Sequence, residues 1–311
     1  MERAVLFIAH GTVETVDELP AFLATIRRGH AAPPELLAEV RRRYEAIGGR
    51  SPLNAINRQI ADKLAATLGV PTRICNRLAP PSPRDVLRKL VSELGGDSGA
   101  RAHMAVIPLA QHSAQVYEAS VREAAADVAP ALTLSCATDW GQTPALIHAY
   151  AARIRQALDL LAPADRAKTT VIMSAHSLPV SVIRAGDAYE REVRKSADAI
   201  AHVLGAGAVR CVVAFQSQGM GTGPGGRPVE WLGPDLRATL NEIQARGDTH
   251  VVVAPVGFLA DHVEILYDID IEAKRWAAEL GLTLSRTESL NAADDLIAVL
   301  ASIARPLLAG S

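Results

Sequence analysis

The chain has 311 residues, a formal net charge of −2 at pH 7, 49% hydrophobic residues and 21% charged residues. This composition is typical of a globular protein with a sizeable core, and the length predicts about two domains. The nearly balanced charge gives no sign of nucleic-acid binding or of a polybasic membrane surface. No apolar run approaches the ~18 residues of a membrane span, and the first run is too short for a signal peptide.

Three cysteines, Cys75, Cys136 and Cys211, lie far apart in apolar, strand-like runs and form no CxxC pair. Such spacing is neither a disulfide framework nor a cluster-binding pattern. We therefore expect buried, unreactive thiols in a reduced, cytoplasmic protein without an iron–sulfur cluster.

The chain begins with an apolar run, 4–8, that ends in His10-Gly11-Thr12. A short continuous run of this kind predicts a buried strand that enters a tight turn. Apolar residues at helical spacing then predict three helices, over 16–26, 34–47 and 51–64.

Strand-like and helical runs alternate along the rest of the chain. The strand-like runs are 72–78, 104–109, 132–137, 169–174, 210–215, 251–256 and 282–285. The helical runs are 83–94, 114–128, 143–161, 187–204, 234–245, 261–280 and 292–308. Alternation of this kind predicts open parallel sheets with helices on both faces, with about four strands in each half.

The best candidate for a linker is Ala162-Pro163-Ala164-Asp165. We therefore expect an N-terminal α/β lobe over 1–162 and a C-terminal α/β lobe over 163–311. The last helix, about 291–308, could pack back on the N-terminal lobe. Two similar halves imply a cleft between them, and ligands of such sheets bind beyond the carboxyl ends of the strands.

Polar residues follow several of these predicted strands. They are His10, then His112 with Ser113 and Tyr117, then His176, and then Gln216 with Ser217. A single histidine at a strand end is more often a hydrogen-bonded structural residue than a ligand. Three histidines on one predicted edge, facing a row of carboxylates, favour a functional site.

That row of carboxylates lies in 255–274, directly after a very apolar run. Glu264, Asp268 and Glu272 recur every four residues, so a helix keeps them near one face and a wider π-type turn would align them better. Like charges at this spacing destabilise a helix by a few tenths of a kcal/mol each. The row is either a path for cations or protons, or a solvated acidic face, and spacing alone leaves both open.

Other motifs exclude several functions. The glycine-rich run 219–226 is interrupted by Pro224 and is followed by Trp231, which predicts a flexible insertion rather than a dinucleotide-binding loop. Ser217 does not lie in a G-x-S-x-G elbow, and the histidines do not form H-E-x-x-H. A hydrolase of either type is therefore not indicated.

Several motifs in a fixed order resemble those of the ferrochelatases, over nearly the whole chain. They are IRRGH at 26–30, YEAIGGRSPL at 44–53, SAHSLP at 174–179, FQSQG at 215–219, WLGPDL at 231–236 and PVGFLADHVEILYDIDIEA at 255–273. The chain looks most like the short, soluble, monomeric bacterial members, which act on coproporphyrin III. We therefore expect neither the C-terminal extension nor the cysteine ligands of the members that carry an iron–sulfur cluster.

The resemblance implies two Rossmann-like, chelatase-type lobes and assigns roles to particular residues. His176 matches the histidine that faces the porphyrin centre, and Glu264 matches the carboxylate beside or opposite it. Asp268 and Glu272 continue an acidic line that the family uses as a conduit for metal or protons. The positions that would bind the porphyrin are His10, Arg27, Arg28, Ser51, Ser113 and Tyr117.

One position departs from the nearest relatives, which have a tyrosine where this chain has His10. That tyrosine can approach the metal of bound product, and an imidazole could do so as a stronger nitrogen donor.

The resemblance therefore predicts a lyase of haem biosynthesis that inserts Fe²⁺ into coproporphyrin III, with porphyrin and iron as its partners and no further cofactor. The alternatives are iron insertion into protoporphyrin IX, a cobalt or nickel chelatase, and a tetrapyrrole carrier. The sequence does not decide which of His176 and Glu264 is the base and which is the metal ligand.

Overall fold

The structure is a computed structural model that describes residues 2–93, 102–205, 207, 209–219 and 228–310. It divides into two compact units, Met1–Trp140 with Asn291–Ser311, and Gly141–Leu290. Each unit contains one four-stranded parallel sheet with helices on both faces, which confirms the predicted α/β class. Most of the predicted glycine-rich insertion, 220–226, lies outside the described residues.

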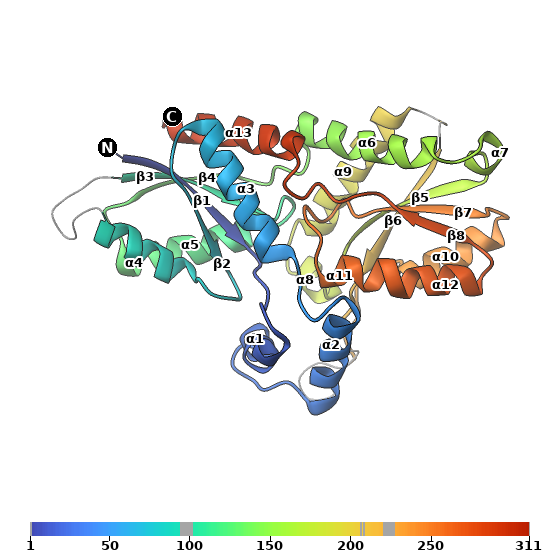
Figure 1. Ribbon diagram of the computed structural model, residues 1–311, viewed down its shortest axis with the longest axis horizontal. Helices are drawn as coiled ribbons and strands as arrows, with labels where there is room; N and C mark the ends of the chain where they lie inside the picture. Colours follow the sequence, from blue (N-terminus) through green and yellow to red (C-terminus); the bar gives the residue numbers. More distant parts are fainter. Residues whose placement is uncertain (1, 94–101, 206, 208, 220–227, 311) are drawn as a thin grey trace. The chain divides into compact units, whose positions relative to one another are not determined.

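The sheet of the first unit has the strand order β2-β1-β3-β4. Its strands are β1 (Glu2–Ala9), β2 (Thr72–Asn76), β3 (Ala102–Pro108) and β4 (Thr133–Cys136). Its helices are η1 (Val16–Glu18), α1 (Leu19–Ile26), α2 (Pro34–Ala46), α3 (Leu53–Leu68), α4 (Pro83–Glu93), α5 (Ala114–Val128) and α13 (Asp294–Ala309). Helices α4 and α5 cover one face of the sheet and α3 and α13 the other (Figure 1).

The sheet of the second unit has the equivalent order, β6-β5-β7-β8. Its strands are β5 (Thr169–His176), β6 (Arg210–Gln216), β7 (His250–Ala254) and β8 (Thr283–Arg286). Its helices are α6 (Pro144–Asp159), α7 (Pro163–Arg166), α8 (Val180–Arg184), α9 (Tyr189–Leu204), α10 (Leu236–Ala245), α11 (Val263–Leu266), the π-helix η3 (Asp268–Ala273) and α12 (Lys274–Glu279). Helices α6 and α9 lie on one face, and α10 and α12 on the other (Figure 1).

The cores follow from the apolar runs that predict the strands. Each inner strand of the second sheet is buried on both faces, with Ile172 and Val253 among the fully buried residues. On the α10 and α12 face, these side chains pack with Leu240 and Ile269. Strands buried on both faces read as continuous apolar runs rather than alternating ones, which is why the sequence reveals them.

The division between the units differs from the boundary expected at 162/163. Residues 141–162 group with the second unit because α6 packs on α9 and β7, and Tyr150 Oη donates to the carbonyl of Phe258 at 2.8 Å. The linker candidate is instead the short helix α7. Helix α13 groups with the first unit, where Lys63 Nζ lies 2.8 Å from Asp294 Oδ1. Within the described part of the chain, we find no helix whose length and hydropathy would suit a membrane span.

Candidate active site

The candidate site lies at the carboxyl ends of the strands of the second sheet. Strand β5 ends at His176, and the neighbouring strand β6 ends at Gln216, which is its partner in the strand register. The segment that follows β7 leads through 255–262 into α11 and the π-helix. The parallel sheet therefore brings chemistry-bearing residues from three separate parts of the sequence to one edge.

His176 and Glu264 form the centre of this edge. His176 Nδ1 donates to Glu264 Oε2 at 3.0 Å, and about a third of each side chain is exposed. The main chain at both residues is held in place, because Tyr189 Oη donates to the carbonyl of His176 and Gln216 Nε2 donates to the carbonyl of Glu264. The pair is thus fixed by its backbone and still accessible to a ligand.

The charges of the two side chains depend on one another. Burial by itself lowers the pKa of His176, but the negative charge of Glu264, the hydrogen bond to it and the charge of Asp268 outweigh burial and raise the pKa. Burial by itself raises the pKa of Glu264, but the charge of His176 and hydrogen bonds from His176 and His262 hold that pKa well below its ordinary value. Each side chain therefore favours the charged form of the other, an imidazolium beside a carboxylate. An incoming cation would compete with the proton for the same two groups.

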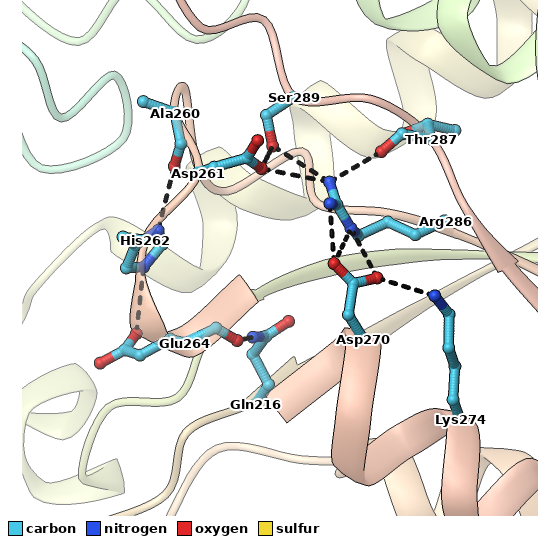
Figure 2. A network of polar contacts seen from close by, with 10 residues as sticks. All are labelled: Gln216, Ala260, Asp261, His262, Glu264, Asp270, Lys274, Arg286, Thr287 and Ser289. Atoms are coloured by element: carbon cyan, nitrogen blue, oxygen red, sulfur yellow. Dashed lines mark hydrogen bonds and ion pairs between the residues drawn. The ribbon is translucent and has the colours of Figure 1, made fainter. Parts of the chain in front are cut away.

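His262 is a residue of the site that sequence reasoning did not select. Its Nε2 lies 3.6 Å from Glu264 Oε2, and its Nδ1 donates to the carbonyl of Ala260 at 3.0 Å (Figure 2). Its ring centre lies 4.8 Å from that of Phe258. The Glu264 carboxylate therefore lies between two imidazoles. On a continuous helix, residues two apart point to different sides. His262 reaches Glu264 because it precedes α11 in an extended conformation, with φ −157° and ψ −179°.

The helical run 261–280 predicts one regular helix, but the structure differs. The acidic segment consists of α11, the π-helix Asp268–Ala273 and α12. The amide of Glu272 donates to the carbonyl of Tyr267, five residues earlier, at 2.9 Å. This is the widened turn that the four-residue spacing of the carboxylates suggested, and π-turns are frequent at functional sites.

The carboxylates of this segment have different surroundings. Asp268 is buried and accepts a hydrogen bond from Ser217 Oγ at 2.5 Å, so at this residue a solvated acidic face is the wrong interpretation. Glu272 is more open and lies 3.8 Å from the exposed Arg275. Asp270 is paired with Arg286 and Lys274 (Figure 2). The segment thus leads from a buried carboxylate to one near the surface.

The six positions expected to bind the porphyrin all lie in the first unit. His10 follows β1, and its Nδ1 lies 3.1 Å from the hydroxyl of Tyr117 on α5. The guanidinium of Arg77 lies 5.8 Å from the centre of the Tyr117 ring. Histidine, tyrosine and arginine therefore meet beyond the ends of β1 and β2.

The other expected positions in the first unit lie at helix ends. Ser113 immediately precedes α5, and the buried Ser51 accepts a hydrogen bond from the amide of Leu53 at 3.3 Å at the start of α3. Arg27 and Arg28 follow the end of α1. Their role in porphyrin binding stays a prediction.

The chain is similar to known proteins over nearly its whole length. A family model described as Ferrochelatase matches residues 2–307. This chain belongs to the ferrochelatase family. The resemblance seen in the sequence motifs is therefore confirmed, and with it the expectation of a metal chelatase, a lyase of haem biosynthesis that uses a porphyrin and iron as substrates.

Curated ferrochelatases match over nearly their full length. The ferrochelatase of Acidobacterium capsulatum is 33% identical, with 97% of this chain and 93% of the relative covered. The coproporphyrin III ferrochelatase of Anoxybacillus flavithermus is 34% identical, with 96% and 94% covered. Among solved structures, SirB from Bacillus subtilis with Fe³⁺ has a TM-score of 0.59 at 16% identity, over 99% of this chain and 96% of that chain, and it shows likeness of fold alone.

Within the described ranges, no group of three or more histidine, cysteine, aspartate or glutamate side chains is arranged to hold a metal ion. The assignment of His176, Glu264, Asp268 and Glu272 as residues that meet the metal therefore stays a prediction from the sequence.

Proposed function

We propose that this ferrochelatase inserts Fe²⁺ into coproporphyrin III to give iron-coproporphyrin, with His176 and Glu264 as the reacting residues. The observation that carries the catalytic assignment is the 3.0 Å pair of His176 and Glu264, beside the buried Asp268. The choice of porphyrin is supported by the name of the Anoxybacillus flavithermus relative. Other relatives are named ferrochelatase without a porphyrin, so protoporphyrin IX is the second candidate.

The reaction releases two protons: Fe²⁺ and a free-base porphyrin give the iron porphyrin and 2 H⁺. The pyrrole N–H bonds must break, the ion must lose water, and the ring must buckle so that nitrogen lone pairs face the metal. A neutral imidazole can accept a pyrrole proton or hold a borderline ion such as Fe²⁺. A carboxylate beside it stabilises the imidazolium that forms.

His176 and Glu264 cannot hold both pyrrole protons at one time, so protons must be passed on to other residues. A protonated His176, the form that Glu264 and Asp268 favour by raising its pKa, must lose its proton before the imidazole accepts one from the porphyrin. In this proposal protons leave along Asp268 and then Glu272 toward the exposed Arg275, or iron enters along the same carboxylates in the opposite direction. His262 gives Glu264 a second imidazole neighbour at 3.6 Å and so another route for charge.

The proposal needs no further cofactor and no iron–sulfur cluster. Cys75 and Cys136 lie on β2 and β4 of the first unit, and Cys211 lies on β6 of the second. Burial raises the pKa of the Cys75 thiol to about 12, which leaves it protonated and a poor metal ligand. Free thiols suit a reducing compartment, and the proposal places the protein in the cytoplasm as a monomer.

An anaerobic absorbance assay tests the reaction. Purified protein and Fe²⁺ are mixed separately with coproporphyrin III and with protoporphyrin IX, and loss of the free-base bands is followed. Faster metallation of coproporphyrin supports the proposal, and faster metallation of protoporphyrin favours the second candidate. Tight binding without metallation of either porphyrin indicates a carrier, and turnover only with Co²⁺ or Ni²⁺ indicates a different chelatase.

The variants His176→Ala and Glu264→Gln test the residues. Each should lower kcat by about 10²–10⁴-fold, the usual contribution of a general acid or base, while porphyrin binding measured by fluorescence quenching persists. Matched controls are His148→Ala, an exposed histidine on α6, and Glu242→Gln, an exposed glutamate on α10. Near-wild-type turnover in either test variant contradicts its assignment.

A further inference from the structure

Arg286 is the last residue of β8, and only 14% of its side chain is exposed. Its Nε and Nη2 donate to the carboxylate of Asp270 at distances of 2.8–3.1 Å. Its Nη1 donates to Asp261 Oδ1 at 3.2 Å and to the carbonyl of Thr287 at 3.1 Å, and it lies 3.4 Å from Ser289 Oγ. Figure 2 shows one guanidinium between two carboxylates from different parts of the acidic segment.

The two carboxylates are attached to the two parts of the segment that carry the site. Asp261 directly precedes His262, and Ser289 Oγ also donates to Asp261 at 2.6 Å. Asp270 lies in the π-helix, two residues after Asp268. Arg286 therefore connects the extended stretch that presents His262 with the wide turn that presents Asp268.

Both the π-turn and the extended stretch need to be held in place. A π-turn is rare, and an extended residue just before a helix places its side chain only if the stretch around it is fixed. Arg–carboxylate pairs with two parallel N–H···O bonds fix orientation as well as distance. Without Arg286, Asp261 and Asp270 would keep their negative charges, both about four-fifths covered, and would lose the cation that they share. Asp270 would keep its contact with Lys274 at 3.2 Å, and the remaining repulsion between the two carboxylates would move the extended stretch away from the π-helix.

We propose that Arg286 is a positioning residue for metal insertion: by holding Asp261 and Asp270 together, it fixes His262 against Glu264 and fixes Asp268 in the π-helix. The inference rests on the proposed roles of this site and is independent of which porphyrin is used. It predicts that Arg286 affects turnover strongly and affects porphyrin binding little.

The test uses the whole protein and the porphyrin that the wild type metallates faster. Arg286→Ala should lower kcat by about 100-fold, the scale of a 1 Å displacement in an active site, while the dissociation constant for porphyrin changes by less than about threefold. Guanidinium ion at millimolar concentration, far below denaturing levels, should restore at least about a tenth of the lost kcat by occupying the vacated position. Arg286→Lys keeps the charge but loses the forked geometry, so it should lie between the wild type and Arg286→Ala.

The control is Arg210→Ala, which removes a half-exposed arginine 3.7 Å from Asp248. Arg210 is the first residue of β6, at the end opposite to Gln216 and the site. The control variant should keep the kcat of the wild type and show no response to guanidinium. If Arg286→Ala does not fold, Asp270→Asn is measured instead, and the same selective loss of kcat is expected.

Two outcomes overturn the proposal. One is a folded Arg286→Ala protein with wild-type kcat. The other is an equal loss of kcat and porphyrin affinity that guanidinium does not restore, which would show a general structural role. His176→Ala is assayed in parallel, and if it stays active, the proposed catalytic roles fail. The role of Arg286 is decided separately, by the loss of kcat in Arg286→Ala and its recovery with guanidinium.

Discussion

Gly257 lies in the turn after β7, where the chain passes very close to β5. Its amide donates to the carbonyl of Ser174 at 2.9 Å. A β-carbon built on Gly257 would lie 2.5 Å from Cβ and 2.6 Å from Cα of Ala175, the residue before His176. Replacing Gly257 by alanine therefore forces the turn and the end of β5 apart.

The size of the effect follows from these distances. Carbon atoms in contact lie about 3.5–4.0 Å apart, so the two segments must separate by roughly 1 Å. Overpacking of this kind costs about 1–3 kcal/mol of unfolding free energy. A displacement of 1 Å at an active site can cost about 100-fold in rate. Gly257→Ala should therefore be both less stable and far less active, because the shift reaches His176 on one side and the stretch that leads to His262 on the other.

The assay combines urea unfolding with anaerobic metallation. The control is Gly281→Ala: Gly281 has φ 72°, so alanine there is strained by about 1–2 kcal/mol, yet nothing lies within 4 Å of the added carbon. Both variants should lose stability, and only Gly257→Ala should lose turnover. Wild-type kcat in Gly257→Ala, or an equal loss of kcat in the control, would refute the reasoning.

Two further predictions follow from the ionisable groups. Because the pKa of Glu264 is lowered, its contribution to stability is present above its ordinary pKa of 4.5 and is lost as the pH falls through the lower folded value. Because the pKa of His176 is raised, its contribution is present below 6.5 and is lost as the pH rises through the higher folded value. The difference in unfolding free energy between the wild type and Glu264→Gln should therefore be largest between about pH 4.5 and 6.5, and a difference independent of pH, measured in urea, would contradict an ion pair. Burial raises the pKa of Cys75 to about 12, and burial together with Glu118 raises that of Cys136 to about 12. Both thiols should resist iodoacetamide at about pH 8 until the chain unfolds, and rapid labelling of the native protein in mass spectra would show that they are accessible.

The fold could be predicted from the sequence because the strands are apolar on both faces. Each of the eight predicted strand-like runs corresponds to a strand of the two sheets, with ends that differ by a few residues. The short helices α7 and α8 were not predicted, since four or five residues are too few to show a helical period. The grouping of 141–162 depends on packing between α6 and α9, and no local pattern records that packing.

The candidate site could be predicted only in part. The four-residue spacing identified Glu264 and Asp268, and the strand ends identified His176. The position of His262 depends on one extended residue, and the buried Asp268 accepts its hydrogen bond from Ser217, which adopts a φ of 61°. These are backbone details that no spacing rule contains.

Arg286 could not be found by spacing either. It lies 16 residues after Asp270 and reaches it only because β8 pairs with β7. A long-range contact of this kind depends on the completed sheet, so the sequence around the acidic segment gives no sign of it.

The second unit is one continuous stretch, whereas the first is completed by α13 from the far end of the chain. During synthesis on the ribosome, all of Gly141–Leu290 emerges before α13 exists. The sheet that is made first must therefore wait for Leu296, Val299 and Leu300, which are buried in the finished unit. Until then one face of β1 and β3 exposes apolar surface, which makes the nascent chain prone to aggregation. A premature stop codon that removes only the last few turns of α13 would thus damage the unit that was translated first.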